Sequence, residues 1–314
     1  MFESINVRKS LLTILKILVF ILFVLVLYNQ LKKITLEEIN AIELTNGSYL
    51  FFACILVFVN WSFELFKWIL TTRKLTKEES YKKSTFSLFA GITTGIVTPN
   101  RIGNFIGRIL YYKGKYRGML ILGTLYGNLA QFVATILFGL IGIMYFDTRL
   151  GQINYNEEIY FGVYFVCCFL ILTYFVYPFV PIEKIKFFRR YANLIARFRK
   201  DAKSLATPLL LISLLRYITF VLQFMFVLSA FGAEFSHQLM YGIFLVYFVT
   251  TLIPNLIMGK LVVRESIALL ILGIFIENSA IILVSSLTVW IINLGIPALI
   301  GFYFLLKNKK VGND

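Results

Sequence analysis

Apolar residues in this sequence are gathered into long runs that are separated by short polar segments. Six of these runs are long enough to cross the hydrocarbon core of a membrane, which takes about 20 helical residues. The runs cover residues 10–28, 49–70, 119–146, 159–180, 208–231 and 280–306. The pattern predicts an all-α integral membrane protein with about six full transmembrane helices.

Two further apolar stretches are shorter, and each is interrupted by a polar turn. Residues 84–98 would form a helix of about 22 Å, which is less than the roughly 30 Å of the hydrocarbon core. They lead into a turn at residues 99–104 and return to basic positions that begin at Lys113. Residues 238–253 lead in the same way into a turn at residues 254–260. We therefore predict two re-entrant helical hairpins. Pairs of full spans are the alternative, because charge counting does not distinguish the two arrangements.

The two polar turns resemble each other in sequence. Each begins with Pro-Asn after a pair of threonines, has a glycine followed by a polar residue, and has an arginine five positions after that glycine. The matching positions are Thr93-Thr94, Pro99-Asn100, Gly103-Asn104 and Arg108 in the first turn, and Thr250-Thr251, Pro254-Asn255, Gly259-Lys260 and Arg264 in the second. We predict one transmembrane domain over residues 1–314, built as an inverted repeat with halves at about 1–147 and 158–306. Chance similarity is the alternative, because few letters match.

The distribution of charge indicates a membrane orientation. The chain is 59% hydrophobic and carries a net charge of +15. Basic residues gather in the segments 71–83 and 181–207, whereas the segments 29–48 and 147–158 together hold six acidic and only three basic residues. This positive-inside pattern places both termini in the cytoplasm, and it argues against nucleic acid as a partner. No small-residue cleavage site follows the first run, so we expect a retained anchor.

The polar turns are the strongest candidates for a functional site. Helix breaks expose unpaired backbone groups, which must be buried in protein or wetted by a cavity. The expected structural residues of the hairpin tips are Pro99, Gly103, Pro254 and Gly259. The expected substrate-binding residues are Asn100, Arg101, Asn104, Arg108, Asn255, Lys260, Arg264 and Glu265. A charge at the bilayer centre costs roughly 2.5–3.5 kcal/mol, so these side chains should share a cavity, a partner charge or a bound anion. Their net positive charge suits a phosphate.

Simpler interpretations exist for the same charges. Arg108 and Lys260 could snorkel to a membrane surface, and Arg264 and Glu265 could form a structural ion pair. Such roles would place these side chains in the fold without any ligand.

Other charged residues lie outside the two turns. Glu64 and Lys67 are three residues apart, so they share a helix face and could pair. Arg216 would either snorkel or face a cavity. Residues 184–203 alternate apolar and basic positions, which predicts an amphipathic helix on the anionic inner leaflet. A solvated basic loop is the alternative.

The sequence contains no recognisable catalytic motif. His237 is the only histidine, which excludes a histidine-rich metal site, and the three cysteines all lie in apolar runs. We therefore expect neither a metal nor a cofactor, and an enzyme is the less favoured interpretation. A membrane-embedded transferase would have to use Glu64 or Glu265 as its acid or base.

Residues 98–104 read Thr-Pro-Asn-Arg-Ile-Gly-Asn. Together with Arg108 they resemble the first signature of the lysylphosphatidylglycerol synthase transmembrane-region family, which is also described as flippase-like. Residues 254–266, which include Val263-Arg264-Glu265-Ser266, resemble its second signature. Lys67-Trp68 resembles a basic-Trp pair at the end of the family's second span. By length and order of segments, the resemblance covers the whole chain.

The chain departs from the family pattern at two places. Asn104 stands where the family usually has Glu, and Lys260-Leu261-Val262 stands where it tends toward Gly-Glu-Leu-Gly. Both changes remove acid from the expected pocket and leave the substrate open. Multidomain members add a soluble aminoacyl-transfer domain. Because this sequence ends at Asp314 without one, we expect no lysyl transfer by this chain.

The resemblance implies a function at the bacterial inner membrane. Such a protein moves, or helps to move, an anionic or aminoacylated phospholipid or a polyprenyl-phosphate-linked lipid between leaflets. The expected partners are therefore membrane lipids. The alternatives are a membrane-embedded transferase and an accessory subunit that acts with lipid-linked substrates in cell-envelope synthesis. Self-association into a homo-oligomer is also left open.

Overall fold

The computed structural model of the protein describes most of residues 21–307. Within that range it does not describe residues 23, 33, 41, 78, 79, 97, 99, 100, 151–156, 185 and 254–258. The structure is 87% helical, and no strand occurs in the described part of the chain. Four helices are long and apolar enough to cross a membrane, namely Gly47–Thr76, Gly114–Phe146, Arg189–Ala230 and Ser279–Leu306. The prediction of an all-α membrane protein is confirmed.

The four long helices correspond to four of the six predicted spans. The predicted span at 159–180 corresponds to α7 (Glu157–Val176), whose apolar part is shorter. Most of the predicted span at 10–28 lies outside the described residues. Residues 24–31 are helical, and the short helix α2 (Leu36–Asn40) follows them.

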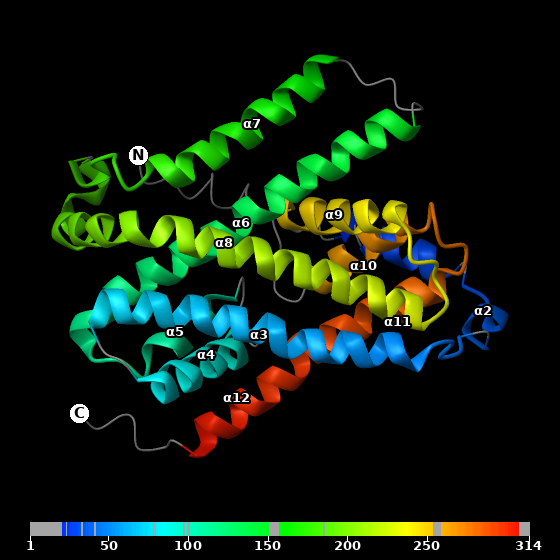
Figure 1. Cartoon of the computed structure of the whole chain (residues 1–314), viewed down its shortest axis with the longest axis horizontal. Coiled ribbons are helices and arrows are strands. Elements are labelled where there is room, and N and C mark those ends of the chain that lie inside the picture. The colour runs from blue at the N-terminus through cyan, green and yellow to red at the C-terminus, as the bar shows by residue number, and fades with distance from the viewer. Residues whose placement is uncertain are drawn as a thin grey trace.

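Helices α3 (Gly47–Thr76) and α8 (Ala192–Ala230) run side by side in opposite directions through the middle of the bundle (Figure 1). The backbone N–H of Thr45, just before α3, donates to the carbonyl of Ala230 at the end of α8, with an N–O distance of 2.9 Å. Helix α6 (Gly114–Leu150) packs against both helices, and α7 packs against α6. The C-terminus of α3 therefore lies at the same end of the bundle as the N-termini of α6 and α8.

The ends of α3 are set by its flanking residues. Asn46 Oδ1 accepts a hydrogen bond from the N–H of Ser48 at 3.0 Å. At the other end Lys77 takes a left-handed conformation, and its N–H donates to the carbonyl of Arg73. These bonds satisfy backbone groups that have no partner within the helix. Arg73 and Lys74 occupy the last turn, where the helix dipole favours cations.

Helices α4 (Tyr81–Ile96) and α5 (Ile102–Ile109) form a tight hairpin. Thr94 Oγ1 donates to the carbonyl of Gly103 at 2.6 Å, and the N–H of Gly103 donates to Thr98 Oγ1 at 2.7 Å. A Cβ atom at Gly103 would lie 2.1 Å from the carbonyl oxygen of Thr94, so no side chain fits there. At 1.5 Å per residue α4 is about 24 Å long and α5 about 12 Å, so neither spans a core of roughly 30 Å.

Helices α9 (His237–Leu252) and α10 (Gly259–Leu272) form the second hairpin. The first hairpin follows directly after the C-terminus of α3, and the second follows directly after the C-terminus of α8. Because α3 and α8 run in opposite directions, the two hairpins enter the bundle from opposite ends (Figure 1).

The last predicted span is interrupted. Helices α11 (Ser279–Trp290) and α12 (Ile296–Lys307) are joined by a π-helical segment, Ile291–Gly295. Thr93 Oγ1 on α4 donates to the carbonyl of Ala298 at 2.7 Å, which fixes α12 against the first hairpin. π-Helical segments are rare and are frequent at functional sites.

The basic segment before α8 is helical, as predicted, but it is not a separate helix. Two 3₁₀ turns, Ile182–Lys184 and Lys186–Tyr191, lead into α8. Residues 192–203 form the first turns of α8 itself, continuous with the span. Among these residues Ile195 and Phe198 are 6% and 1% exposed, because this face packs on the bundle.

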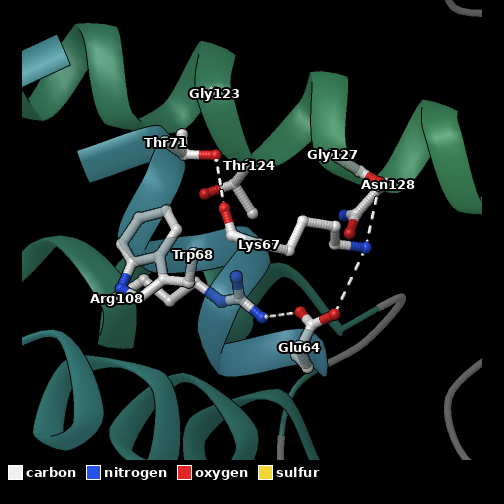
Figure 2. A pocket seen from close by; sticks show the side chains of 9 residues that line it. All are labelled: Glu64, Lys67, Trp68, Thr71, Arg108, Gly123, Thr124, Gly127 and Asn128. Atoms are coloured by element: carbon white, nitrogen blue, oxygen red, sulfur yellow. Dashed lines mark hydrogen bonds and ion pairs between the residues drawn. The ribbon is translucent and has the colours of Figure 1, made fainter. Parts of the chain in front are cut away.

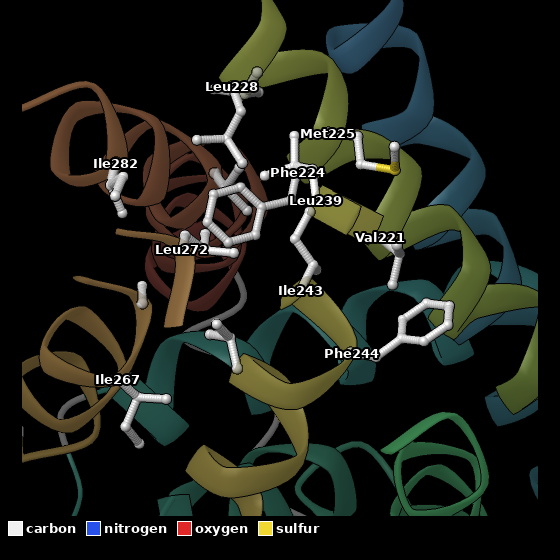
Figure 3. Close-up of a cluster of buried hydrophobic side chains, with 14 of the residues drawn as sticks. Val221, Phe224, Met225, Leu228, Leu239, Ile243, Phe244, Ile267, Leu272 and Ile282 are labelled. Carbon is white, nitrogen blue, oxygen red and sulfur yellow. The ribbon is translucent and has the colours of Figure 1, made fainter. Parts of the chain in front are cut away.

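The apolar core of the second half is built where α8, α9 and α10 meet (Figure 3). Phe224 and Leu228 of α8 pack there with Ile243 of α9 and Leu272 of α10. Other large apolar side chains, such as Phe58, are exposed on the outside of the bundle. An apolar exterior is the arrangement expected for contact with lipid chains.

Candidate functional site

Glu64 is the centre of a group of charged side chains from three helices. Its Oε1 accepts from Arg108 Nη2 at 2.5 Å, and its Oε2 lies 3.2 Å from Lys67 Nζ and 2.9 Å from Arg216 Nη1. Glu64 and Lys67 belong to α3, Arg108 to α5 and Arg216 to α8. These four residues are called the Glu64 group below. Through it, three elements that are far apart in sequence share one carboxylate.

The Glu64 group lies inside the bundle. The side chains of Glu64 and Arg108 are each 6% exposed, and that of Arg216 is 15% exposed. Thr76, at the basic end of α3, is about 18 Å away from Glu64 along the helix axis at 1.5 Å per residue. These charges are therefore well removed from the charged end of the bundle.

Arg108 is held by contacts on three sides. Its Nε donates to Asn104 Oδ1 at 3.0 Å, one turn earlier on α5. Its guanidinium lies over the ring of Trp68, 4.9 Å from the ring centroid. Gly91 on α4 leaves the space for its aliphatic part, because a Cβ there would lie 2.7 Å from Arg108 Cγ. The close packing of the first hairpin therefore sets the position of this guanidinium.

Lys67 points toward α6 (Figure 2). Its Nζ donates to the carbonyl of Gly127 at 3.3 Å and lies 3.5 Å from Ser213 Oγ. The backbone of α6 lies close to α3 at Gly123, since a Cβ on Gly123 would lie 2.6 Å from Thr71 Cγ2. Small residues on α6 thus let α3 approach closely enough for Lys67 to reach a backbone carbonyl.

Arg216 connects the Glu64 group to a chain of buried amides. Its Nε donates to Asn60 Oδ1 at 2.9 Å, and Asn60 Nδ2 donates to Asn293 Oδ1 at 2.8 Å. Asn293 Nδ2 donates in turn to Gln223 Oε1 at 2.7 Å. Gln223 Nε2 ends the chain at the carbonyl of Ala53, at 3.0 Å. Since Asn293 lies in the π-helical segment, the chain joins α3 and α8 to the break between α11 and α12.

The Glu64 group carries more positive than negative charge. One carboxylate faces three cations, which leaves a formal excess of two positive charges. Unbalanced buried charges cost several kcal/mol each. An anion placed beside Arg108, Lys67 and Arg216 would offset this cost, and two guanidinium groups would supply strong, directional hydrogen bonds to phosphate oxygens.

A small pocket opens beside these charges (Figure 2). It is a narrow space with room for about one water molecule, and it opens out of the protein. Glu64, Lys67 and Arg108 line it together with Trp68 and residues of α6. The opening reaches Lys67 and Arg108, and a phosphate would have to displace side chains to enter it.

A second charged pair lies elsewhere in the bundle. Arg264 Nη2 pairs with Glu265 Oε1 on α10, and Arg264 Nη2 also donates to the carbonyl of Ser286 on α11 at 3.1 Å. Among the described residues, no hydrogen bond or ion pair joins this pair to the Glu64 group. The charges at the two turns therefore form two sites.

Residues 13–301 match the family model described as Lysylphosphatidylglycerol synthase TM region, which is nearly the whole chain. The chain belongs to this family. No curated protein and no solved structure matches the chain. In this family member the described residues contain no group of three or more His, Cys, Asp or Glu that could hold a metal ion.

The structure brings some of the predicted site residues of this family member together. Asn104 and Arg108 belong to the arrangement around Glu64. Arg101 lies at the tip of the first hairpin, where it is exposed and within electrostatic range of Glu64 and Arg216. Its backbone is left-handed, with φ of +57°. That conformation costs a residue with a Cβ roughly 1–2 kcal/mol, and such strain clusters at functional sites.

The other predicted site residues lie in the second turn or next to the tips. Arg264 and Glu265 pair with each other, and this contact is compatible with a structural role and with a place in a binding site. Gly259 and Lys260 start α10. Lys260 has a helical backbone, and its side chain lies outside the described part. The remaining predictions, Pro99, Asn100, Pro254 and Asn255, fall outside the described residues.

Glu64, Lys67 and Arg216 received only structural or secondary roles in the sequence analysis. The pairing of Glu64 with Lys67 was predicted from their spacing, and it occurs at 3.2 Å. Their contact with Arg108 and Arg216 was not predicted, because these partners are distant in sequence. A usable signal was present, since each is a charged residue within or beside an apolar run, where charge is costly.

Proposed function

We propose that this protein binds the phosphate of an anionic membrane lipid at the Glu64 group and helps to move that head group across the bilayer. The observation that carries the proposal is the sharing of one buried carboxylate by Lys67, Arg108 and Arg216. The excess positive charge favours an anion, and the enclosed position excludes water that would weaken the attraction.

The phosphate is the shared chemistry of the candidate lipids. Anionic phospholipids and polyprenyl-phosphate lipids both present it, joined to chains that can remain in the apolar exterior. The pocket beside Arg108 has no room for acyl or prenyl chains, so these chains would remain outside it.

The arrangement of the hairpins supports movement as well as binding. They enter from opposite ends of the bundle, after α3 and after α8. We infer that they are re-entrant and belong to an inverted repeat, the plan in which broken helices form sites reached in turn from each side of a membrane. With the basic ends of α3, α6 and α8 in the cytoplasm, both termini would also lie there, at the inner membrane of a bacterium.

The embedded-transferase alternative gains no support from the site. Both oxygens of Glu64 contact cations, with Arg108 on Oε1 and with Lys67 and Arg216 on Oε2. These contacts occupy both oxygens of Glu64, so neither oxygen is free to give a proton to a substrate or to take one from it. We therefore assign Glu64 the role of holding cations in place.

The test is lipid movement in proteoliposomes. The full chain would be reconstituted with labelled anionic phospholipid or labelled polyprenyl phosphate, and the fraction reaching the outer leaflet measured over time. Arg108→Gln and Arg216→Gln should slow movement at least tenfold, a factor that corresponds to about 1.4 kcal/mol. Lys74→Gln, at the exposed end of α3, is the matched control and should move lipid at the parental rate.

Movement at the parental rate by folded Arg108→Gln and Arg216→Gln proteins would rule out the proposal. The two lipid classes are separate arms of this experiment. The arm whose rate depends on these arginines identifies the lipid that the protein handles.

A further inference from the structure

A second polar site lies between α10 and α11, formed by Arg264, Glu265 and Ser286 and called the Arg264 site below. Arg264 pairs with Glu265 and donates to the Ser286 carbonyl at 3.1 Å. Glu265 is 4% exposed and Ser286 is 1% exposed. On α10 the neighbouring Val263 is also buried. The site is therefore enclosed by apolar surroundings, where every polar atom needs a hydrogen-bond partner.

Several polar atoms of the Arg264 site lack such a partner among the described residues. They are Arg264 Nε, Glu265 Oε2 and Ser286 Oγ. No other place in the described part of the chain gathers as many buried side-chain atoms of this kind. Leaving a buried donor or acceptor unpaired is costly. Unpaired atoms concentrated at one place point to a ligand that completes them.

The chemistry of these atoms restricts the ligand. Arg264 Nε can only donate, Glu265 Oε2 can only accept while ionised, and the Ser286 hydroxyl can do both. The Arg264–Glu265 pair is neutral as a unit, unlike the Glu64 group. A phosphate would satisfy Arg264 and repel the free oxygen of Glu265. A hydroxyl group satisfies both, because it accepts from Arg264 and donates to Glu265.

The two sites are connected through aromatic side chains. The guanidinium of Arg216 lies 5.2 Å from the ring centroid of Phe220, whose ring centroid is 6.3 Å from that of Tyr247. Tyr247 lies within electrostatic range of Arg264 and Glu265. The two sites are therefore separated by a short chain of packed side chains.

We infer that the Arg264 site binds hydroxyl groups of the lipid head group, such as those of glycerol or a sugar, and thereby selects which anionic lipid the protein accepts. This inference rests on the proposed function. In it the Glu64 group supplies affinity for the phosphate, and the Arg264 site distinguishes head groups that carry the same charge.

The experiment compares two lipids that differ only in hydroxyl groups. Phosphatidylglycerol and phosphatidylmethanol carry the same phosphodiester charge, and the second lacks the glycerol hydroxyls. Their competition for the purified full chain in detergent is measured by native mass spectrometry. The parent should prefer phosphatidylglycerol by at least about tenfold, which corresponds to about 1.4 kcal/mol. Glu265→Gln and Ser286→Ala should each reduce that preference to about twofold or less, with phosphatidylmethanol binding unchanged.

Matched controls separate this inference from the proposed function. Thr288→Val, on the same helix as Ser286, should keep the parental preference. Arg108→Gln should weaken the binding of both lipids equally. If the parent binds the two lipids equally well, or if Ser286→Ala keeps the preference, the Arg264 site does not recognise hydroxyl groups of the lipid. If the parent binds neither lipid, the inference and the phospholipid arm of the proposed function both fail. Should Glu265→Gln not fold, the result for Ser286→Ala decides.

Discussion

Glu64 of α3 and Arg216 of α8 form an ion pair with an Oε2–Nη1 distance of 2.9 Å, which joins the two central helices of the bundle at one charge. The same carboxylate holds Lys67 and Arg108. The position of the first hairpin, through Arg108, and the position of α8, through Arg216, therefore depend on one side chain.

Removing the charge of Glu64 should destabilise the whole bundle. In Glu64→Gln three buried cations would lose their only carboxylate partner among the described residues. Breaking a buried ion pair by removing one partner costs about 3–5 kcal/mol. The thermal unfolding midpoint of the protein in detergent should fall clearly below that of the parent.

A second substitution tests whether repulsion among the cations causes that loss. The double variant Glu64→Gln with Lys67→Met should recover part of the midpoint, because one uncompensated charge is gone. Lys74→Gln, at the exposed end of α3, should leave the midpoint within error of the parent. If the double variant is less stable than Glu64→Gln, the charge explanation is wrong.

The first hairpin should depend on a glycine contact. In Gly103→Ala the new Cβ would lie 2.1 Å from the Thr94 carbonyl oxygen, so α4 and α5 must separate. Overpacking of this kind costs about 1–3 kcal/mol, and separation would displace Arg108. We expect lower thermal stability and weaker binding of anionic lipid. Gly114→Ala is the control, because nothing lies within 4 Å of a Cβ at that position. Equal behaviour of the two variants would contradict the packing argument.

The sequence predicted the helical membrane architecture because apolar run length is a direct consequence of the bilayer thickness. The runs at 49–70, 119–146, 208–231 and 280–306 each lie within or closely coincide with a long apolar helix. The interruption at Ile291–Gly295 was not predicted. Apart from Asn293 and Gly295 its residues are apolar, so the hydropathy pattern did not indicate the change in hydrogen-bond register.

The candidate site was predicted only in part, for a similar reason. Asn104 and Arg108 were found because Pro and Gly mark the turn beside them. Glu64 and Arg216 were noticed as charges in apolar runs, but their contact depends on how α3 pairs with α8. Spacing along one helix reveals neighbours three or four residues apart, and it carries no information on which face meets another helix.

The amide chain should behave as one coupled unit. Asn60→Ala would remove an acceptor from Arg216 and a donor from Asn293. Leaving a buried polar group unpaired costs about 1–3 kcal/mol, so Asn60→Ala and Asn293→Ala should each lower stability. In the double variant the loss should be smaller than the sum, with a coupling of about 0.5–3 kcal/mol. Unfolding of the four proteins in detergent measures this difference. Additive losses would show that the two amides act independently.

Accessibility of single cysteines should distinguish a re-entrant hairpin from two full spans. In a cysteine-free background, Glu43→Cys should react with an impermeant maleimide in intact cells. Lys74→Cys should react only after permeabilisation, because it lies at the basic end of α3. Ile102→Cys at the exposed tip of α5 is the informative position. Helix α4, which precedes Ile102, is about 24 Å long and is therefore too short to cross the hydrocarbon core. Ile102→Cys should therefore resist labelling from outside, and rapid labelling there would instead indicate that the hairpin crosses the membrane completely.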